Sequence, residues 1–120
     1  MGSASEELRD RTKSFALRIV RLFRSLPRSP DAQVMGKQLL RCGTSVAANY
    51  RAVCRARSKA EFIAKIGVVV EEADESMFWL ELLSETNTIA AEKMKSLLDE
   101  ARELTAIFTA SQRTARGNKH

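Results

Sequence analysis

Arginine side chains that could bind phosphate are the most prominent chemical feature of this 120-residue sequence. A guanidinium group carries a permanent charge and donates two parallel hydrogen bonds to one phosphate. The basic side chains recur at helical spacing along the first half of the chain. We therefore predict that a set of basic residues contacts the phosphates of a nucleic acid, namely Arg11, Arg18, Arg21, Arg24, Lys37, Arg41, Arg51 and Arg55.

The charge of the chain is divided unevenly along its length. Residues 1–65 contain 14 Lys or Arg and 5 Asp or Glu, whereas residues 66–120 contain 6 and 10, so a basic half precedes an acidic half. Two uses of the basic residues follow, and they are compatible. The arginines bind phosphates through charge without reading sequence. Alternatively they pair with acids on a neighbouring copy of the chain, which closes a ring or extends a filament.

Side chains suited to catalysis or metal binding are scarce. The only histidine is His120, so neither Cys42 nor Cys54 has an imidazole base in the folded part. The glycines are scattered and form no phosphate-binding loop. The acids within residues 71–75 lack the Glu-x-x-His pairs of metal-binding helical bundles. We expect a protein that is not an enzyme and that has no metal or cofactor.

The cysteines and the hydropathy pattern indicate a cytoplasmic protein. Cys42 and Cys54 fall in one predicted helix, roughly 18 Å apart, which is too far for a disulfide. No apolar run approaches the roughly 20 residues that span a bilayer. The sequence does not start with a charged and then apolar signal segment. We expect reduced cysteines, a cytoplasmic location and no membrane contact.

The spacing of apolar residues predicts an all-α fold with one domain, residues 1–112, followed by a disordered basic tail, residues 113–120. Ser58 and Glu61 form a capping box, and Thr88 is the expected N-cap of the last helix. Short connections favour an antiparallel up-down-up-down four-helix bundle. The expected helices span about residues 5–26, 30–57, 59–84 and 89–112.

Small and polar residues of the second predicted helix have structural roles in this interpretation. Gly36 and Gly43 each cost the helix about 1 kcal/mol relative to Ala, and we expect them to allow close approach of a neighbouring helix. Asn49, with Ser45 and Thr44, is expected to supply hydrogen bonds that fix helix packing, rather than a ligand site.

The third predicted helix has a second apolar strip outside its core stripe. A helix with two apolar strips usually buries both, and a chain of this length has only one core. We therefore predict that this side of the helix contacts another subunit. The predicted oligomer interface consists of Val68, Glu71, Glu72, Glu75, Phe78, Trp79 and Leu82.

Three segments together resemble a known family. They are LRCGTSVAANYR at residues 40–51, ARSKAEF at residues 56–62, and EEADES with the following Trp-Leu pair within residues 71–80. They are similar to the bacterial four helix bundle protein family, also called the S23 or 23S ribosomal RNA intervening-sequence protein family. The resemblance extends from about residue 15 to residue 108.

The resemblance implies a left-handed antiparallel bundle, a ring-shaped homopentamer and no established enzymatic activity. Some members are encoded within insertions in large-subunit ribosomal RNA genes. A structurally similar pentamer is the accessory variability protein of diversity-generating retroelements, which binds nucleic acid and a reverse transcriptase. That second likeness is one of fold and charge, not of motif.

We expect a non-enzymatic homo-oligomer, a pentamer by the family resemblance, that binds RNA or DNA through arginine-rich surfaces with little sequence selectivity. The alternative is an assembly or adaptor protein that binds a protein partner such as a reverse transcriptase. In that alternative the arginines lie in subunit contacts.

Overall fold

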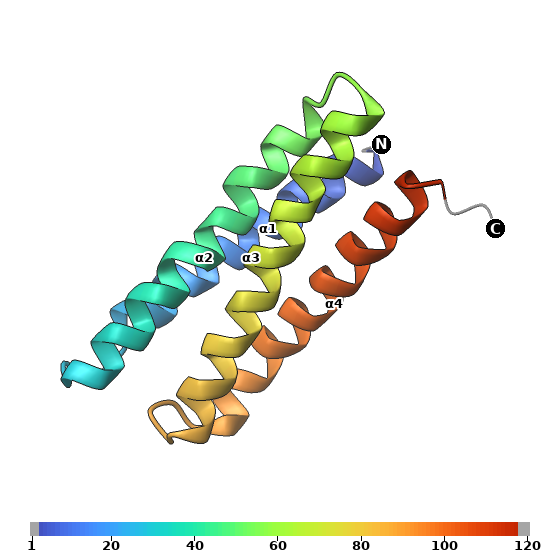
Figure 1. Ribbon diagram of the computed structural model, residues 1–120. Coiled ribbons are helices and arrows are strands. Elements are labelled where there is room, and N and C mark those ends of the chain that lie inside the picture. The colour runs from blue at the N-terminus through green and yellow to red at the C-terminus, as the bar shows by residue number, and fades with distance from the viewer. Residues whose placement is uncertain (1–2, 118–120) are drawn as a thin grey trace.

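The computed structural model describes residues 3–117, which form four helices and no strand. The helices are α1 (Ala4–Arg24), α2 (Pro30–Cys54), α3 (Lys59–Glu85) and α4 (Ala91–Ala115). They lie side by side in a bundle, and successive connections fall at alternate ends of it (Figure 1). The predicted all-α four-helix bundle is confirmed.

The first two helices end earlier than the apolar pattern predicts. The backbone N–H of Ser25 turns back to the carbonyls of Leu22 and Phe23, and the chain leaves α1 before Pro27. Arg55 closes α2 with a comparable turn. The following residues must then reach the extended conformation that Ser58 has at the start of α3. Apolar periodicity does not report such turns, which depend on the residues that follow.

The last helix begins and ends later than predicted. The prediction that Thr88 is its N-cap is wrong, because Asn87 has a positive φ of 58° and Ala90 occupies the N-cap without a side-chain hydrogen bond. At the other end α4 continues into the segment expected to be a disordered tail, and Gly117, with φ 74°, stops it. Residues 118–120 of that predicted tail lie outside the described residues.

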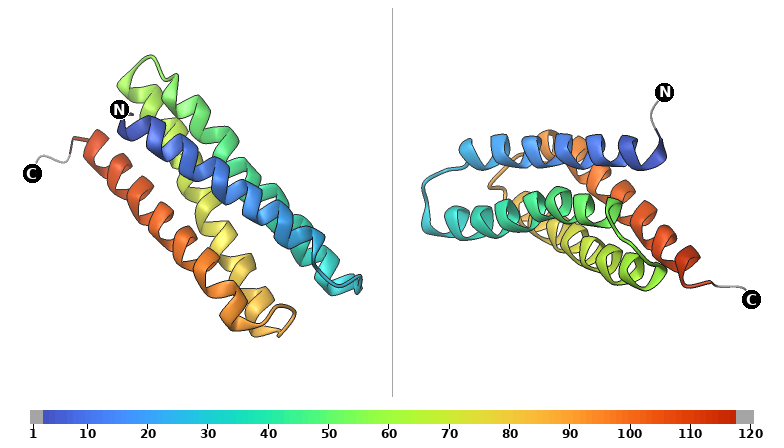
Figure 2. Two further views of the ribbon diagram at one scale, coloured as in Figure 1. Left: turned by 180° about the vertical axis from the view of Figure 1, so that it is seen from behind. Right: turned by 90° about the horizontal axis from the view of Figure 1, so that it is seen from above.

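Helices α2 and α3 form the centre of the bundle. They pack closely against each other, α1 packs on α2, and α4 packs on α3. Among neighbouring helices, α1 and α4 contact each other least, and α4 diverges from α1 toward its C-terminus (Figure 2). The core contains large, fully buried side chains from every helix, including Phe15, Ile19, Leu39, Ile66, Leu80, Leu104 and Phe108.

One aromatic pair joins the ends of α2 and α4. The rings of Tyr50 and Phe108 have centroids 5.3 Å apart and are tilted by 34°. Burial raises the pKa of Tyr50 to about 12, because a phenolate would lose its hydration there. The tyrosine is therefore a neutral core residue at ordinary pH.

Two glycines on α2 allow α1 to approach closely, as predicted. A Cβ atom on Gly43 would lie 2.9 Å from Cγ1 and 3.3 Å from Cβ of the fully buried Ile19. A Cβ atom on Gly36 would instead meet the ends of the Leu26 and Phe23 side chains. A methyl group at position 36 would therefore displace only side-chain ends, whereas one at position 43 would press on Ile19 close to the backbone of α1.

We expect Gly43→Ala to lower the free energy of unfolding by about 1 kcal/mol. Overpacking against a rigid β-branched side chain costs roughly 1–3 kcal/mol, and the better helix propensity of alanine offsets about 1 kcal/mol of it. Gly36→Ala is the matched control and should be near neutral, because flexible side-chain ends can move. Urea denaturation measures both, and equal effects of the two substitutions would contradict this assignment.

Candidate nucleic-acid interface

The eight predicted phosphate contacts do not form one continuous stripe. Three of them, Arg11, Arg18 and Arg41, bind other side chains of the same chain. The other five are exposed, and none has an ion pair or side-chain hydrogen bond within residues 3–117: Arg21, Arg24, Lys37, Arg51 and Arg55. The second group is available to an external anion.

Arg51 and Arg55 are brought together with two basic residues of α1. A hollow between α1 and α2 is lined by Arg9, Lys13, Arg51 and Arg55, together with Asp10 and Cys54. Four positive charges and one negative charge therefore surround one solvent-filled space. Such an arrangement attracts an anion more strongly than isolated charges on a flat surface.

Arg9 and Lys13 are not among the eight predicted residues, although the sequence holds a signal for them. Helix α2 returns along α1, and Ile19 lies against Gly43. The same register places residues 9 and 13 beside the end of α2, where Arg51 and Arg55 lie. Basic pairs spaced by four residues on both helices thus face one hollow.

The basic surface continues over the turn between α2 and α3. A second hollow is lined by Ala52, Arg55, Arg57, Glu61 and Lys65, so Arg55 borders both hollows. Glu61 is partly neutralised, since its carboxylate lies 3.8 Å from the Lys65 ammonium. We call this surface the basic end, and define it by Arg9, Lys13, Arg51, Arg55 and Arg57.

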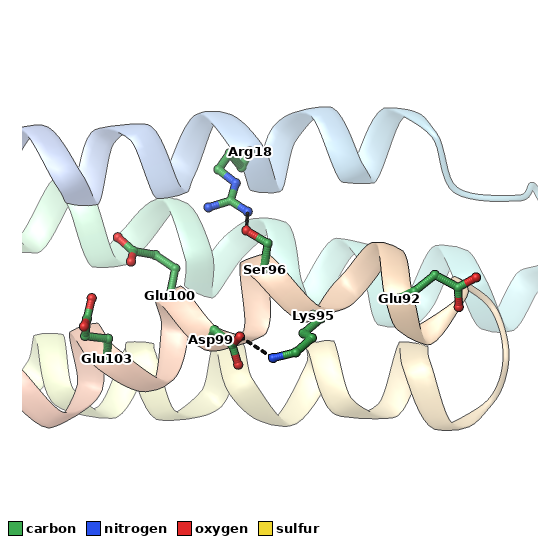
Figure 3. A pocket seen from close by; sticks show the side chains of 7 residues that line it. All are labelled: Arg18, Glu92, Lys95, Ser96, Asp99, Glu100 and Glu103. Atoms are coloured by element: carbon green, nitrogen blue, oxygen red, sulfur yellow. Dashed lines mark hydrogen bonds and ion pairs between the residues drawn. The ribbon is translucent and has the colours of Figure 1, made fainter.

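Arg11 and Arg18 lie on another side of α1 and point toward α4. The Arg11 Nε and Nη2 atoms donate to Glu100 at 3.1 and 2.7 Å, and Nη2 also donates to Glu103. These carboxylates, Glu100 first, raise the pKa of Arg11 above its ordinary value. Arg18 donates to the hydroxyl of Ser96 at 2.9 Å (Figure 3).

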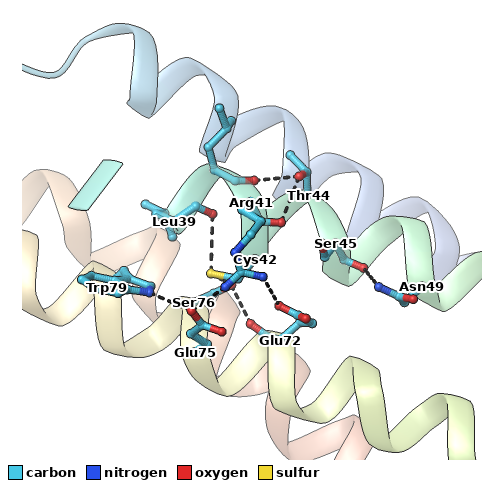
Figure 4. Close-up of polar contacts among 11 residues, drawn as sticks. Leu39, Arg41, Cys42, Thr44, Ser45, Asn49, Glu72, Glu75, Ser76 and Trp79 are labelled. Atoms are coloured by element: carbon cyan, nitrogen blue, oxygen red, sulfur yellow. Dashed lines mark hydrogen bonds and ion pairs between the residues drawn. The ribbon is translucent and has the colours of Figure 1, made fainter. Parts of the chain in front are cut away.

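Arg41 is bound by the acids of α3. Its guanidinium donates to Glu72 at 3.3 Å and to Glu75 at 2.6 Å (Figure 4). The hydrogen bonds from Arg41 and then from the Trp79 indole, at 3.1 Å, hold the pKa of Glu75 below its ordinary value. Two acids of the predicted subunit interface therefore pair within the chain, whereas Glu71 is exposed.

The predicted apolar strip of α3 is only partly exposed. Val68 is 40% and Phe78 is 52% exposed, whereas Trp79 and Leu82 are half-buried against the core. The Phe78 and Trp79 rings meet edge to face, with centroids 4.8 Å apart. Val34 of α2, which is 61% exposed, is a further apolar surface residue outside the predicted strip.

The polar residues in the middle of α2 have structural contacts. The Asn49 side-chain amide donates to the Ser45 carbonyl at 2.9 Å, a bond within α2 and not between helices (Figure 4). Cys42 is fully buried, and its Sγ lies 3.4 Å from the Ser76 hydroxyl where α2 meets α3. Burial raises the pKa of the Cys42 thiol, which makes this cysteine a packing residue.

Comparison with known proteins identifies the family. A profile described as 23S rRNA-intervening sequence protein matches residues 6–110, which include the whole basic end. The chain belongs to the 23S rRNA-intervening sequence protein family. The resemblance inferred from residues 40–51 and the two later segments is thereby confirmed.

A solved structure agrees with the family assignment. It is the crystal structure of a protein with unknown function from the S23 ribosomal protein family of Bacteroides thetaiotaomicron VPI-5482. It is 36% identical to this chain with a TM-score of 0.83, and the match covers 91% of this chain and 97% of that chain. No curated protein matches the chain.

Within residues 3–117, no helix combines the length and the apolar character needed to cross a bilayer. The same part of the chain has no group of three His, Cys, Asp or Glu side chains placed to hold a metal ion.

Proposed function

We propose that this protein is a non-enzymatic, cytoplasmic nucleic-acid-binding protein whose basic end contacts the phosphates of RNA or DNA. The observation that carries the proposal is the hollow between α1 and α2, where four basic side chains face one acid. Arg51 and Arg55 have no partner among residues 3–117 that would have to be displaced. The family's description, which refers to 23S rRNA, supports RNA as the ligand.

The proposed binding has little sequence selectivity. Base edges are read by side chains that stack on bases or pair with their hydrogen-bonding groups. The lining of the hollow contains no aromatic, Asn or Gln side chain, and its basic residues can read only guanine edges in addition to phosphates. A positively charged lining of this kind favours contacts with the sugar-phosphate backbone of the nucleic acid. Such contacts position the nucleic acid but do not specify its sequence.

We further propose that the protein assembles through α3 into a homo-oligomer. By the family resemblance, this oligomer is a pentameric ring of antiparallel bundles. The exposed side chains of Val68 and Phe78 support a subunit contact on this helix. Glu72 and Glu75 support it less, because Arg41 of the same chain already binds both.

An assembly or adaptor protein is the second candidate function. Phe78 is half-exposed on α3, and the phosphate contacts proposed above do not use it. An apolar surface of this kind suits a protein partner, for which a reverse transcriptase is the candidate by analogy with the retroelement accessory protein.

Salt dependence of binding tests the nucleic-acid proposal. With about four phosphate contacts to a single strand, affinity should fall roughly 50-fold between about 50 and 200 mM salt. Filter binding of a labelled RNA at the two salt concentrations measures this change. An affinity that does not change with salt would exclude phosphate contacts as the source of binding.

A further inference from the structure

Polar side chains join α1 to α4 along one edge of the bundle. We call this contact the α1–α4 seam and define it by Arg11 and Arg18 of α1 and by Ser96, Glu100 and Glu103 of α4. Among neighbouring helices of the bundle, these two pack against each other least. An open hollow beside the seam is lined by Arg18, Glu92, Lys95, Ser96, Asp99, Glu100 and Glu103 (Figure 3).

The geometry at Arg11 is that of a bound phosphate with carboxylates in its place. Two neighbouring donors of the guanidinium, Nε and Nη2, meet the two oxygens of Glu100 at 3.1 and 2.7 Å. A phosphate is bound by arginine through the same fork. Glu103 adds a second carboxylate, and its side chain is 64% exposed, so solvent reaches the seam.

The surroundings of the seam also repel a polyanion. Four carboxylates line the hollow, and only Asp99 has a lysine partner there, with Lys95 Nζ at 2.8 Å. Arg11 is two residues from both Arg9 and Lys13, which belong to the basic end. Arg11 points toward α4, on another side of α1 from the basic end, and its charge is cancelled there by the carboxylates of α4.

We propose that Glu100 and Glu103 form an internal phosphate mimic that withholds Arg11 from nucleic acid, so that the α1–α4 seam is an autoinhibitory contact. This inference rests on the proposed function of the basic end. It adds that α4 limits how far a nucleic-acid strand extends around α1. Removing the two carboxylates releases Arg11 as an additional phosphate contact.

The test measures the binding of a 20-residue oligothymidylate by fluorescence anisotropy. Glu100→Gln combined with Glu103→Gln should raise the affinity about threefold to fivefold. It should also steepen the dependence of log affinity on log salt by about 0.7, which corresponds to one more phosphate contact on a single strand. Adding Arg11→Gln to this variant should remove both gains.

A charge-matched control separates release of Arg11 from a general change in net charge. Asp74→Asn with Glu85→Gln removes two negative charges from exposed positions of α3 that have no ion pair within residues 3–117. This variant should leave the salt slope unchanged. If the seam variant has no higher affinity and no steeper slope than this control, the autoinhibitory contact is excluded.

A single substitution tests the proposal without removing the acids. Arg11→Gln in the otherwise unchanged protein should leave the salt slope for the oligothymidylate unaltered, because Arg11 is already occupied and makes no phosphate contact. A salt slope shallower by about 0.7 would show that Arg11 already contacts a phosphate and would overturn the proposal. If the unchanged protein does not bind and the seam variant does, the basic end fails as the binding surface while the autoinhibitory contact stands. If neither binds, both proposals fail.

Discussion

Reversing two charges at the basic end, with Arg51→Glu and Arg55→Glu, should reduce nucleic-acid affinity about 100-fold. Two phosphate contacts are lost, and two negative charges are added beside the remaining bases Arg9 and Lys13. Both arginines are exposed and have no partner within residues 3–117, so the fold should not change. Filter binding at constant salt measures the effect.

A second charge reversal is the control for this prediction. Arg21 and Arg24 are also exposed and also lack a partner among the described residues, but they lie near the opposite end of α1. Arg21→Glu with Arg24→Glu changes the net charge equally and should cost less than about tenfold in affinity. Equal losses in the two variants would mean that nucleic acid binds along α1 and not mainly at the basic end.

Light scattering on the same variants separates the two candidate functions. A pentamer would have a mass near five times 13.4 kDa. Loss of nucleic-acid binding with an unchanged mass supports phosphate contacts at Arg51 and Arg55. Loss of the oligomer would instead assign these arginines to subunit contacts, as the adaptor alternative requires.

The helices could be predicted from the sequence because burial of one face places apolar residues at the helical period of 3.6 residues. Phe15 and Ile19, four residues apart on α1, are both fully buried, as the pattern indicates. The helix ends depend on cap and turn conformations that periodicity does not report. Asn87 takes a positive φ and moves the start of α4 past Thr88, and Gly117 rather than Gln112 marks its end.

The sequence indicates which residue types form the candidate site, but it does not indicate which neighbouring helix each side chain faces. The helical period places Arg11 and Arg41 at the sides of their helices, but it does not say which helix lies beside them. In the fold, Arg11 meets Glu100 across 89 residues of sequence and Arg41 meets Glu75 across 34. Arg9 and Lys13 join the hollow only through the register of α1 against α2.

Phe108→Ala should have the largest effect on stability, a loss of about 3–5 kcal/mol in the free energy of unfolding. The ring is fully buried, and its removal leaves a cavity between α4 and the rest of the core. Its contact with Tyr50 adds roughly 0.5–1.5 kcal/mol to what burial alone supplies. A loss of this size is a large part of the total free energy of unfolding of a typical domain, which is roughly 5–15 kcal/mol.

Ile107→Ala is the matched control, because Ile107 is the neighbouring apolar residue of α4 and is only partly buried. It should cost less than about 2 kcal/mol in urea denaturation. A loss for Phe108→Ala no larger than that for Ile107→Ala would mean that α4 is not anchored through this ring. Since α4 packs on α3 far more than on α1, it depends on α3 and on residues such as Phe108 that reach the centre. The basic end belongs to α1, α2 and the following turn, so the still folded variant should bind nucleic acid there undiminished.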